Sequence, residues 1–349
     1  MIDVRTEVDL ENMQPFGNME GKNSMIFLAN DKQLNHKFVV KKIKKSDVYK
    51  DYGNKKESNL FLESSILYKV AHPNVSEIQY ASFDTDFVYI VMPYYKNGSI
   101  QSILEKRNLS VREIIKYSLD FLSGLLFVHA NNLIHFDIKP TNILLNNNGK
   151  AVLTDFGLAK YIDNSSELAI PNKMYNLHFP PEYLISYYLS RQSDIYQVGI
   201  TMYRMANGNE FWNNQVKTFE QSKIIDGVFP DRKSYLPHIP PKLRKVVNKC
   251  LEVDVDKRYQ SVLDIINDLS VIDGKIDWLY EKKDGIGEIW RNKVENMEVC
   301  IILKELEKAY EIETVKMNVQ SKRRSRISSM CKKGVSKQEA YKMIQKYIE

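Results

Sequence analysis

The sequence predicts an α+β protein with a small β-rich front part, a larger α-rich back part and a small C-terminal β-plus-helix module. Apolar and polar residues alternate through residues 24–30 and 37–45, which is the period of β-strands. A further strand, residues 87–92, runs into Pro93, and from there the long segments have the apolar spacing of helices, as in residues 111–130. We expect a cleft where the front and back parts meet.

Two further helices follow from apolar spacing. In the front part, one helix face carries Leu60, Leu62, Ile66, Leu67 and Val70. In the back part, residues 241–250 have the same periodicity. The front part is therefore predicted as strands followed by one helix.

Length and composition indicate a large catalytic unit with an appendage. The chain has 349 residues, of which 43% are hydrophobic and 27% charged, as in folded globular proteins and unlike disordered ones. The three cysteines are scattered without C-x-x-C spacing, so we expect reduced thiols and no zinc site. No leader pattern and no apolar run of about 18 residues occur, so we expect a cytoplasmic protein without a membrane span.

The texture of the sequence changes after Asp273. Ser336 and Glu339 form a capping box that opens a helix, and one face of that helix carries Ala340, Met343, Ile344 and Tyr347. Short alternating runs precede the helix, and the candidate strands are residues 277–281, 287–291, 297–303 and 310–317. We expect a module that folds separately and recruits a substrate or regulator, unless Trp278 and Trp290 pack on the back part.

A basic segment, residues 321–337, separates the last of these strands from the helix. Residues 321–349 carry a net charge of +7, against +6 for the whole chain, so the positive charge is concentrated here. Three interpretations remain open: a solvated linker, a contact with nucleic acid or an anionic surface, or a self-phosphorylated regulatory segment. The run itself lacks aromatic residues for base stacking.

The chemistry of the chain is concentrated in one stretch. Residues 134–142 read Ile-His-Phe-Asp-Ile-Lys-Pro-Thr-Asn, and Asp155-Phe-Gly follows thirteen residues after Asn142. This places a carboxylate, an ammonium and a carboxamide on one short loop, with a second carboxylate nearby. Phosphoryl transfer needs this combination, because charge developing on the γ-phosphate must be neutralised while the acceptor hydroxyl is positioned.

In this stretch the sequence resembles the eukaryotic-type (Hanks-type) serine/threonine protein kinase family, over roughly residues 13–273. The resemblance implies a two-lobed protein-kinase fold, a protein substrate, and ATP and Mg²⁺ as cofactors. It also implies that Asp137 orients the substrate hydroxyl and accepts its proton, that Lys139 supports the γ-phosphate, and that Asn142 and Asp155 hold magnesium. A lysine two residues after Asp137 favours serine or threonine acceptors over tyrosine.

The resemblance divides the chain into parts. Residues 1–12 are expected as an N-terminal extension and residues 13–273 as the kinase domain. Within that domain we expect an N-lobe at 13–93, a hinge at 93–96 and a C-lobe at 97–273. Residues 274–349 remain as the accessory module.

The residues around ATP follow from the strand period and the resemblance. In the run FVVKKIKK, Val39 and Lys41 share one strand face and Val40 and Lys42 share the other. We therefore assign Lys41 as the lysine that grips the α- and β-phosphates, beneath Val39 as the roof over adenine. Lys42 is expected to be a solvated strand lysine. Glu63, in the following helix, is the expected partner of Lys41.

The resemblance also assigns the adenine pocket and the phosphate-covering loop. Met92 would be the gatekeeper, Pro93 to Tyr95 the hinge, with Tyr95 supplying its N–H, and Leu144 the floor under adenine. The loop keeps only the middle glycine of the family pattern, and its expected nucleotide contacts are Gly21, Ser24 and Ile26.

Three structural signatures of the family recur, at Pro180-Pro-Glu182, Asp194-x4-Gly199 and Arg258. By the resemblance, Glu182 and Arg258 form a buried ion pair and Asp194 braces the catalytic loop. They argue against small-molecule phosphotransferases.

Two departures from the family pattern affect function. Phe136 replaces the arginine that receives an activation-loop phosphate, so activity should not need such phosphorylation, and Tyr161, Ser165 and Ser166 would be plain loop residues. Tyr175 stands where a threonine usually touches the catalytic aspartate and lysine. The alternative is a pseudokinase or nucleotide-binding scaffold that recruits a partner through the C-terminal module, although no metal ligand or strand lysine is missing.

Overall fold

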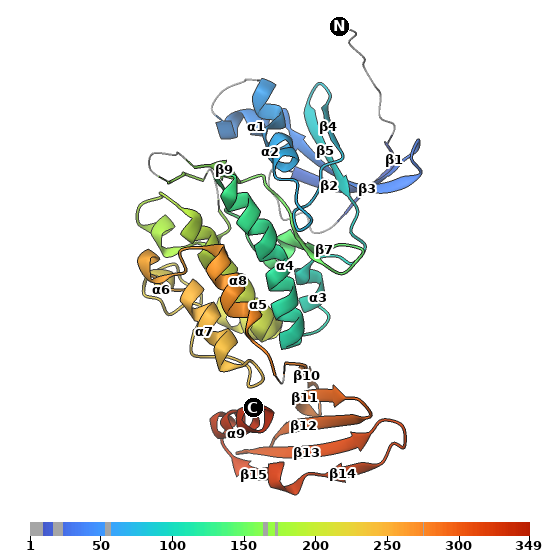
Figure 1. Cartoon of the computed structure of the whole chain (residues 1–349), viewed down its shortest axis with the longest axis vertical. Helices are drawn as coiled ribbons and strands as arrows, with labels where there is room; N and C mark the ends of the chain where they lie inside the picture. Colours follow the sequence, from blue (N-terminus) through green and yellow to red (C-terminus); the bar gives the residue numbers. More distant parts are fainter. Residues whose placement is uncertain (1–9, 17–23, 53–56, 163–166, 172–173, 275) are drawn as a thin grey trace.

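The computed structural model of the chain describes residues 10–16, 24–52, 57–162, 167–171, 174–274 and 276–349. Figure 1 shows a small β-rich lobe above a larger helical lobe, with a β-sheet and one helix beneath them. The predicted α+β architecture is confirmed. In the described part of the chain, no helix is both long and apolar enough to cross a membrane.

The N-lobe is a five-stranded antiparallel sheet with the strand order β1-β2-β3-β5-β4. The predicted strands and helix of this lobe are confirmed, whereas β1 and β4 were not predicted because they are short and mostly exposed. Since β1 begins at Leu10, residues 10–12 belong to the first strand and not to an extension. The elements are β1 (Leu10–Pro15), β2 (Ser24–Asp31), β3 (His36–Lys44), α1 (Lys45–Tyr52), η1 (Glu57–Phe61), α2 (Leu62–Lys69), β4 (Tyr80–Phe83) and β5 (Phe87–Pro93).

The C-lobe is built around α4, which ends near the cleft and has a fully buried face. Ser110 and Glu113 form a capping box at its start, which explains why the helix begins at Val111 as predicted. The helices are α3 (Ile100–Leu104), α4 (Val111–Ala130), η3 (Asn176–His178), η4 (Pro181–Leu184), α5 (Arg191–Val216), α6 (Ser222–Ile225), α7 (Pro241–Cys250), η5 (Val255–Lys257) and α8 (Val262–Ser270). The predicted helix at 241–250 is confirmed as α7.

Short strand pairs in the C-lobe carry the loops that contain residues 134–142 and 155–157. One pair joins β6 (Leu133–Ile134) to β9 (Lys160–Tyr161), and the other joins β7 (Ile143–Leu145) to β8 (Ala151–Leu153). The turn η2 (Pro140–Asn142) lies between β6 and β7. The two stretches that carry the family resemblance, residues 134–142 and 155–157, therefore adjoin these short strands.

The C-terminal module is an antiparallel sheet of six strands with one helix packed on it (Figure 1). Its core contains Trp278, Trp290, Ile301, Ile312 and Ile344, all nearly or fully buried. The four predicted strands and the capped helix are confirmed. The elements are β10 (Leu279–Lys283), β11 (Gly287–Val294), β12 (Met297–Glu305), β13 (Tyr310–Asn318), β14 (Arg324–Arg326), η6 (Ser328–Met330), β15 (Lys332–Val335) and α9 (Lys337–Ile348).

The interpretation of residues 321–337 as a solvated linker is wrong for most of its length. Both β14 and β15 pair with β13, for example Lys316 opposite Ser325 and Glu311 opposite Lys333. The sequence hid these strands because they are short and rich in lysine and arginine, which have low β-propensity. Backbone pairing with an already formed strand overrides that preference.

The module contacts the C-lobe through an apolar and hydrogen-bonded interface. Trp290 Nε1 donates a hydrogen bond to His238 Nδ1 at 3.3 Å, and the His238 ring stacks on Tyr280. The Arg112 backbone N–H donates to the Ile276 carbonyl at 3.0 Å, and Arg112 also pairs with Asp277. Trp290 therefore packs on the C-lobe, which is the case in which we did not expect the module to fold separately. The module is docked on the lobe.

Candidate active site

Asp194, in the first turn of α5, fixes the backbone of residues 135–142, here called the catalytic loop. This fully buried carboxylate accepts hydrogen bonds from the backbone N–H groups of His135 and Phe136, each at 2.8 Å. Phe136 has a φ of 66°, a left-handed conformation that bulky residues rarely adopt. The predicted brace is confirmed, and it holds a strained turn immediately before Asp137.

Gln197, one turn further along α5, bridges the two neighbours of Asp137. Its Oε1 accepts a hydrogen bond from the Ile138 N–H at 2.9 Å, and its Nε2 donates to the Phe136 carbonyl at 2.8 Å. The side chain is only 1% exposed. Because both ends of one carboxamide are used, rotation of the peptides on either side of Asp137 would break at least one bond.

The side chains of Asp137, Lys139 and Asn142 meet in the catalytic loop. Lys139 Nζ lies 2.8 Å from Asp137 Oδ2, and Asn142 Nδ2 donates to the same oxygen at 2.8 Å and to the Asp137 carbonyl at 2.9 Å. Within the described part of the chain, no group donates to Asp137 Oδ1. That oxygen can accept a hydrogen bond from an incoming hydroxyl.

Lys41, Glu63 and Asp155 form a second cluster, contributed by β3, α2 and the loop after β8. Lys41 Nζ lies 2.7 Å from Glu63 Oε1 and 2.8 Å from Asp155 Oδ1. The Lys41 side chain is 9% exposed, whereas that of Asp155 is 42% exposed. The cluster is therefore closed on the Glu63 side and open to solvent at Asp155.

The charges in this cluster follow from its geometry. Burial alone would lower the pKa of Lys41, but Asp155 and Glu63 outweigh it and hold that pKa above its usual range. The partial loss of water around Asp155 opposes its ionisation, yet Lys41, Lys139 and His135 together lower its pKa to about 2. Burial raises the pKa of Glu63 against the opposing pull of Lys41. At neutral pH an ammonium and an ionised Asp155 therefore face the cleft.

The two clusters are joined through the backbone, which brings the expected metal ligands together. The Thr154 N–H donates to the Asn142 carbonyl at 3.0 Å, so Asn142 lies beside the residue that precedes Asp155. A carboxamide and a carboxylate oxygen are ligands that suit Mg²⁺. A Cβ at Gly157 would lie 3.1 Å from Lys41 Nζ and 3.3 Å from Asp155 Oδ1, so a side chain would crowd this place. The residues present fit a magnesium-bound nucleotide.

The residues expected around adenine lie on adjoining strands. Val39 of β3 is the cross-strand partner of Met92 of β5, and Pro93 is the last residue of β5. Leu144 of β7 forms an isolated bridge with Ser99, just beyond the hinge. The structure thus brings Val39, Met92 and Leu144 to the junction of the two lobes.

The structure describes only some of the remaining residues that are expected to contact the nucleotide. Ser24 and Ile26 are in β2, where Ile26 pairs with Lys41 of β3. Gly21 lies outside the described residues. The Tyr95 carbonyl accepts a hydrogen bond from the Gly98 N–H at 3.1 Å and so closes the turn after the hinge. Tyr95 as the hinge donor stays a prediction.

Phe136 is fully buried in an apolar cluster with Ile134, Ile162 and Leu189. Ile162 belongs to the activation segment, the stretch between Asp155 and Glu182, and its N–H donates to the Asn132 carbonyl at 2.9 Å. This packing joins the activation segment to the catalytic loop without any charged group at position 136. Ser165 and Ser166 lie outside the described residues, and Tyr161 is 45% exposed in β9.

Tyr175 contacts the catalytic loop in a way that a threonine could not. Lys139 Nζ lies 5.0 Å from the centroid of the Tyr175 ring, which is cation–π distance. The ring is 39% exposed, so it forms part of the surface next to Asp137. This contact replaces the expected hydroxyl and helps to orient Lys139.

The predicted ion pair of Glu182 and Arg258 is confirmed. Arg258 Nη1 and Nη2 donate to the two Glu182 carboxylate oxygens at 2.8 and 2.7 Å, and Arg258 is 2% exposed. Ser193 Oγ donates to Glu182 Oε1 at 2.7 Å. The pair ties the end of the activation segment to the lower C-lobe.

Sequence reasoning missed a second set of buried polar contacts beneath the catalytic loop. His178 Nδ1 lies 3.0 Å from the Ile138 carbonyl, Arg204 Nη1 lies 3.2 Å from His178 Nε2, and Arg204 Nη2 donates to Gln101 Oε1 at 2.8 Å. Gln197 and Arg204 lie on one face of α5 together with Asp194 and Thr201, and all four residues are buried. This polar stripe at helical spacing was a signal in the sequence, but it does not identify the partners of its residues.

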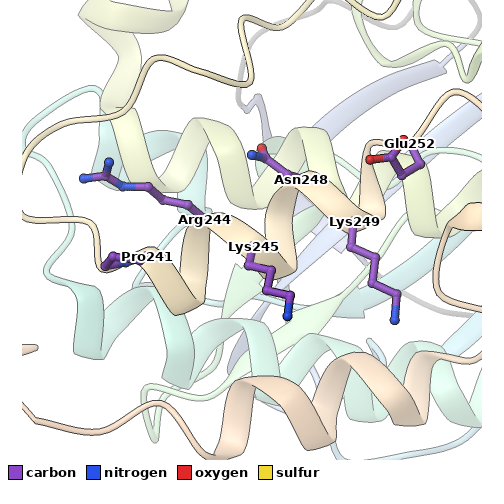
Figure 2. Close-up of a pocket in the computed structure, with 6 residues that line it drawn as sticks. All are labelled: Pro241, Arg244, Lys245, Asn248, Lys249 and Glu252. Atoms are coloured by element: carbon purple, nitrogen blue, oxygen red, sulfur yellow. The ribbon is translucent and has the colours of Figure 1, made fainter.

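A surface hollow on α7 is separate from these clusters. Figure 2 shows its lining residues, with the long side chains of Lys245 and Lys249 extending from the same side of the helix. The hollow lies on α7 in the lower part of the C-lobe (Figure 1), and three of its six lining residues are basic. The lining residues are Pro241, Arg244, Lys245, Asn248, Lys249 and Glu252.

Comparison with known proteins agrees with this geometry. The protein kinase domain family matches residues 12–268, so the chain belongs to the protein kinase family. A probable serine/threonine-protein kinase of Clostridium perfringens is 30% identical over 257 residues, covering 72% of this chain and 37% of the relative. Myosin light chain kinase A of Dictyostelium discoideum is 31% identical over 250 residues, covering 69% and 81%.

The serine/threonine-protein kinase PrkC of Bacillus subtilis is 25% identical over 272 residues, covering 77% of this chain and 41% of the relative. The chain spans only 37%, 38% and 30% of the length of three bacterial relatives that are named as serine/threonine-protein kinases. The similarity is therefore to their kinase domains, and the remaining parts of those proteins have no counterpart in the match.

Proposed function

We propose that this chain transfers the γ-phosphate of ATP to serine and threonine hydroxyls of protein substrates, with Mg²⁺ as cofactor. The observation that carries the proposal is the joining of two clusters. Lys41, Glu63 and Asp155 are linked through the Thr154–Asn142 backbone bond to the side chains of the catalytic loop. A phosphate-binding cation and an acceptor-orienting carboxylate thereby face one cleft.

In this proposal each cluster has one task. Lys41, held by Glu63, binds the α- and β-phosphates, and Asp137 orients the acceptor hydroxyl and accepts its proton through Oδ1. Lys139, already paired with Asp137 at 2.8 Å, stabilises the charge on the transferred phosphoryl group. Bound by Asn142 and Asp155, Mg²⁺ would neutralise phosphate charge. Positioning and electrostatics supply nearly all of the rate in this chemistry.

The test is transfer of label from γ-³²P-ATP, with Mg²⁺, to the chain itself and to a generic basic protein. Asp155→Asn, Asp137→Ala and Lys41→Ala should each reduce incorporation to background while the circular dichroism spectrum stays unchanged. Lys42→Ala is the matched control, because Lys42 Nζ lies over the Phe87 ring, 3.9 Å from its centroid, on the other face of β3. Loss of activity in Lys42→Ala with activity retained in Lys41→Ala would refute the assignment. Acid hydrolysis of the labelled product should give phosphoserine or phosphothreonine.

We also infer that activity does not need a phosphate on the activation segment. Support comes from the apolar packing of Phe136 with Ile162 and Leu189, which leaves no cation at position 136 to receive a phosphate. The double variant Ser165→Ala, Ser166→Ala should keep its rate within about three-fold of the parent chain. A fall to background would contradict the inference and point to Lys160 or Arg191 as the phosphate receiver.

A nucleotide-binding scaffold is the alternative, and the altered phosphate-covering loop is the feature that favours it, because only its middle glycine is kept. A scaffold would show a thermal shift with ATP and Mg²⁺ but no transfer to any substrate. The kinase proposal requires both, and requires Asp155→Asn to lose the magnesium-dependent part of the shift. In either case the docked C-terminal module is our candidate for recruiting a protein substrate or regulator.

A further inference from the structure

The far edge of the module's sheet is formed by basic strands. β14 and β15 pair with opposite ends of β13, and Figure 1 shows them on the side of the module that faces away from the C-lobe. These strands carry most of the basic residues of segment 321–337. The cations that are exposed on this edge, here called the basic edge, are Lys316, Lys322, Arg323, Arg324, Arg326, Lys332 and Lys333.

The cations of the basic edge form no ion pair among the described residues, whereas other cations of the module do. Arg291 pairs with Glu281, Lys304 with Glu313, and Lys337 with Glu288. In the sheet register Glu311 lies opposite Lys333, and no acidic residue lies opposite Arg324 or Arg326, so the basic edge keeps a net positive charge. The edge therefore gains electrostatic free energy from a polyanion, and charge complementarity indicates its occupant.

The polarity of the basic edge distinguishes among polyanions. The large apolar residues of this segment are Ile327, Met330 and Val335. All three are partly buried, and Met330 and Val335 pack against the core of the module. Protein interfaces are centred on exposed apolar or aromatic anchors, and membrane-surface segments insert apolar side chains. The basic edge presents neither. Binding to a phosphate backbone needs only correctly held cations, because the favourable term is release of counterions.

We propose that the basic edge binds the phosphate backbone of nucleic acid without regard to base sequence. The arginines of β14 can each make bidentate contacts with phosphate oxygens. The pairing of β14 and β15 with β13 fixes the backbone that carries these side chains, so less backbone conformational entropy is lost on binding than for a flexible basic tail. This property is independent of phosphoryl transfer and places the kinase domain next to whatever protein is bound on the same nucleic acid.

The experiment measures binding of the full chain to a fluorescent 20-nucleotide single strand and a 20-base-pair duplex of mixed sequence, by anisotropy, from 50 to 300 mM KCl. The logarithm of the association constant should fall linearly with the logarithm of salt, with a slope of about −0.7 per contact for single strands and about −0.9 for duplex. Engagement of most of the basic edge predicts a slope steeper than about −3. No binding at 50 mM KCl, or a slope near zero, would overturn the proposal.

The variants separate the basic edge from general positive charge. Arg324→Glu with Lys333→Glu should weaken binding at least ten-fold and make the slope shallower by about 2. Lys242→Glu with Lys245→Glu, at two exposed positions of α7, makes the same change in net charge at another basic surface, and binding should stay within two-fold of the parent chain. Figure 2 shows Lys245 on this helix. Equal losses in both variants would overturn the proposal.

Two competitors test the class of ligand. A poly-glutamate peptide and vesicles containing anionic phosphatidylserine are compared with the oligonucleotide at equal negative charge. The oligonucleotide should bind at least ten-fold more tightly than either. Tighter binding to the peptide or the vesicles would assign the basic edge to an acidic protein or to a membrane, against our proposal. Failure of the kinase assay would leave this outcome unaffected.

Discussion

Replacing Gln197 by leucine removes both hydrogen bonds that hold the neighbours of Asp137, while keeping the side chain similar in size. The Phe136 carbonyl and the Ile138 N–H belong to residues with no exposed surface. An unsatisfied buried polar group costs about 1–3 kcal/mol, so leaving both unpaired would cost about 2–6 kcal/mol. The loop can lower this cost by moving, and that movement displaces Asp137.

We therefore expect Gln197→Leu to lower kcat about 100-fold, since a displacement of about 1 Å at a positioned group has effects of this size. The KM for ATP should change little, because Lys41 and Asp155 have no contact with Gln197. Steady-state kinetics with a basic protein substrate measures both constants. Gln192→Leu is the matched control on the same helix, since Gln192 bonds to Gln260 and not to the catalytic loop.

Gln197→Glu separates positioning from general packing. An ionised carboxylate can accept from the Ile138 N–H but cannot donate to the Phe136 carbonyl, whereas a protonated carboxyl can do both. Burial raises the pKa of such a carboxyl. The ratio of variant to parent kcat should therefore rise as the pH is lowered from 8 to 6. A constant ratio, or a Gln197→Leu protein with unchanged kcat, would refute the reasoning.

Three further predictions concern stability and solubility. Arg258→Met should lower the free energy of unfolding by about 3–5 kcal/mol, because it leaves the Glu182 carboxylate without its buried partner. The double variant Arg258→Met, Glu182→Gln should regain part of this free energy, as measured by urea titration. Burial and Arg244 lower the pKa of His238 to about 3, so between pH 6.5 and 3 the unfolded chain binds a proton that the folded chain does not, and stability falls as pH falls. Lowering the pH from 7.5 to 5 should therefore reduce the free energy of unfolding of the parent chain by about 2 kcal/mol, and this loss should be absent in His238→Gln. Parallel pH profiles of the two proteins would contradict this prediction. A chain ending at Asp273 exposes the surface around His238 that Trp290 covers in the full chain, so it should be less soluble. A truncated chain that is as soluble and as stable as the full chain would show that the docked interface contributes nothing to stability.

Much of the candidate site could be predicted from the sequence because its residues lie close together in the chain or repeat with a simple period. Asp137, Lys139 and Asn142 lie within one short loop, so their meeting is a local property. The period of a strand together with the family resemblance chose Lys41 over Lys42, and Lys41 is the lysine that contacts Glu63 and Asp155. The capping box of Ser336 and Glu339 correctly marked the start of α9.

Other features depended on contacts between distant parts of the chain. Gln197 reads as an ordinary polar residue in a helix, and its role appears only when α5 packs under a loop about 60 positions earlier in the chain. The strands β14 and β15 have unfavourable composition and exist because β13 supplies backbone partners. The docking of Trp290 on His238 likewise required both surfaces to be formed. Sequence alone determined the local chemistry and the periodic elements, whereas tertiary structure decided which buried polar groups found partners, because that satisfaction is a non-local property of the folded chain.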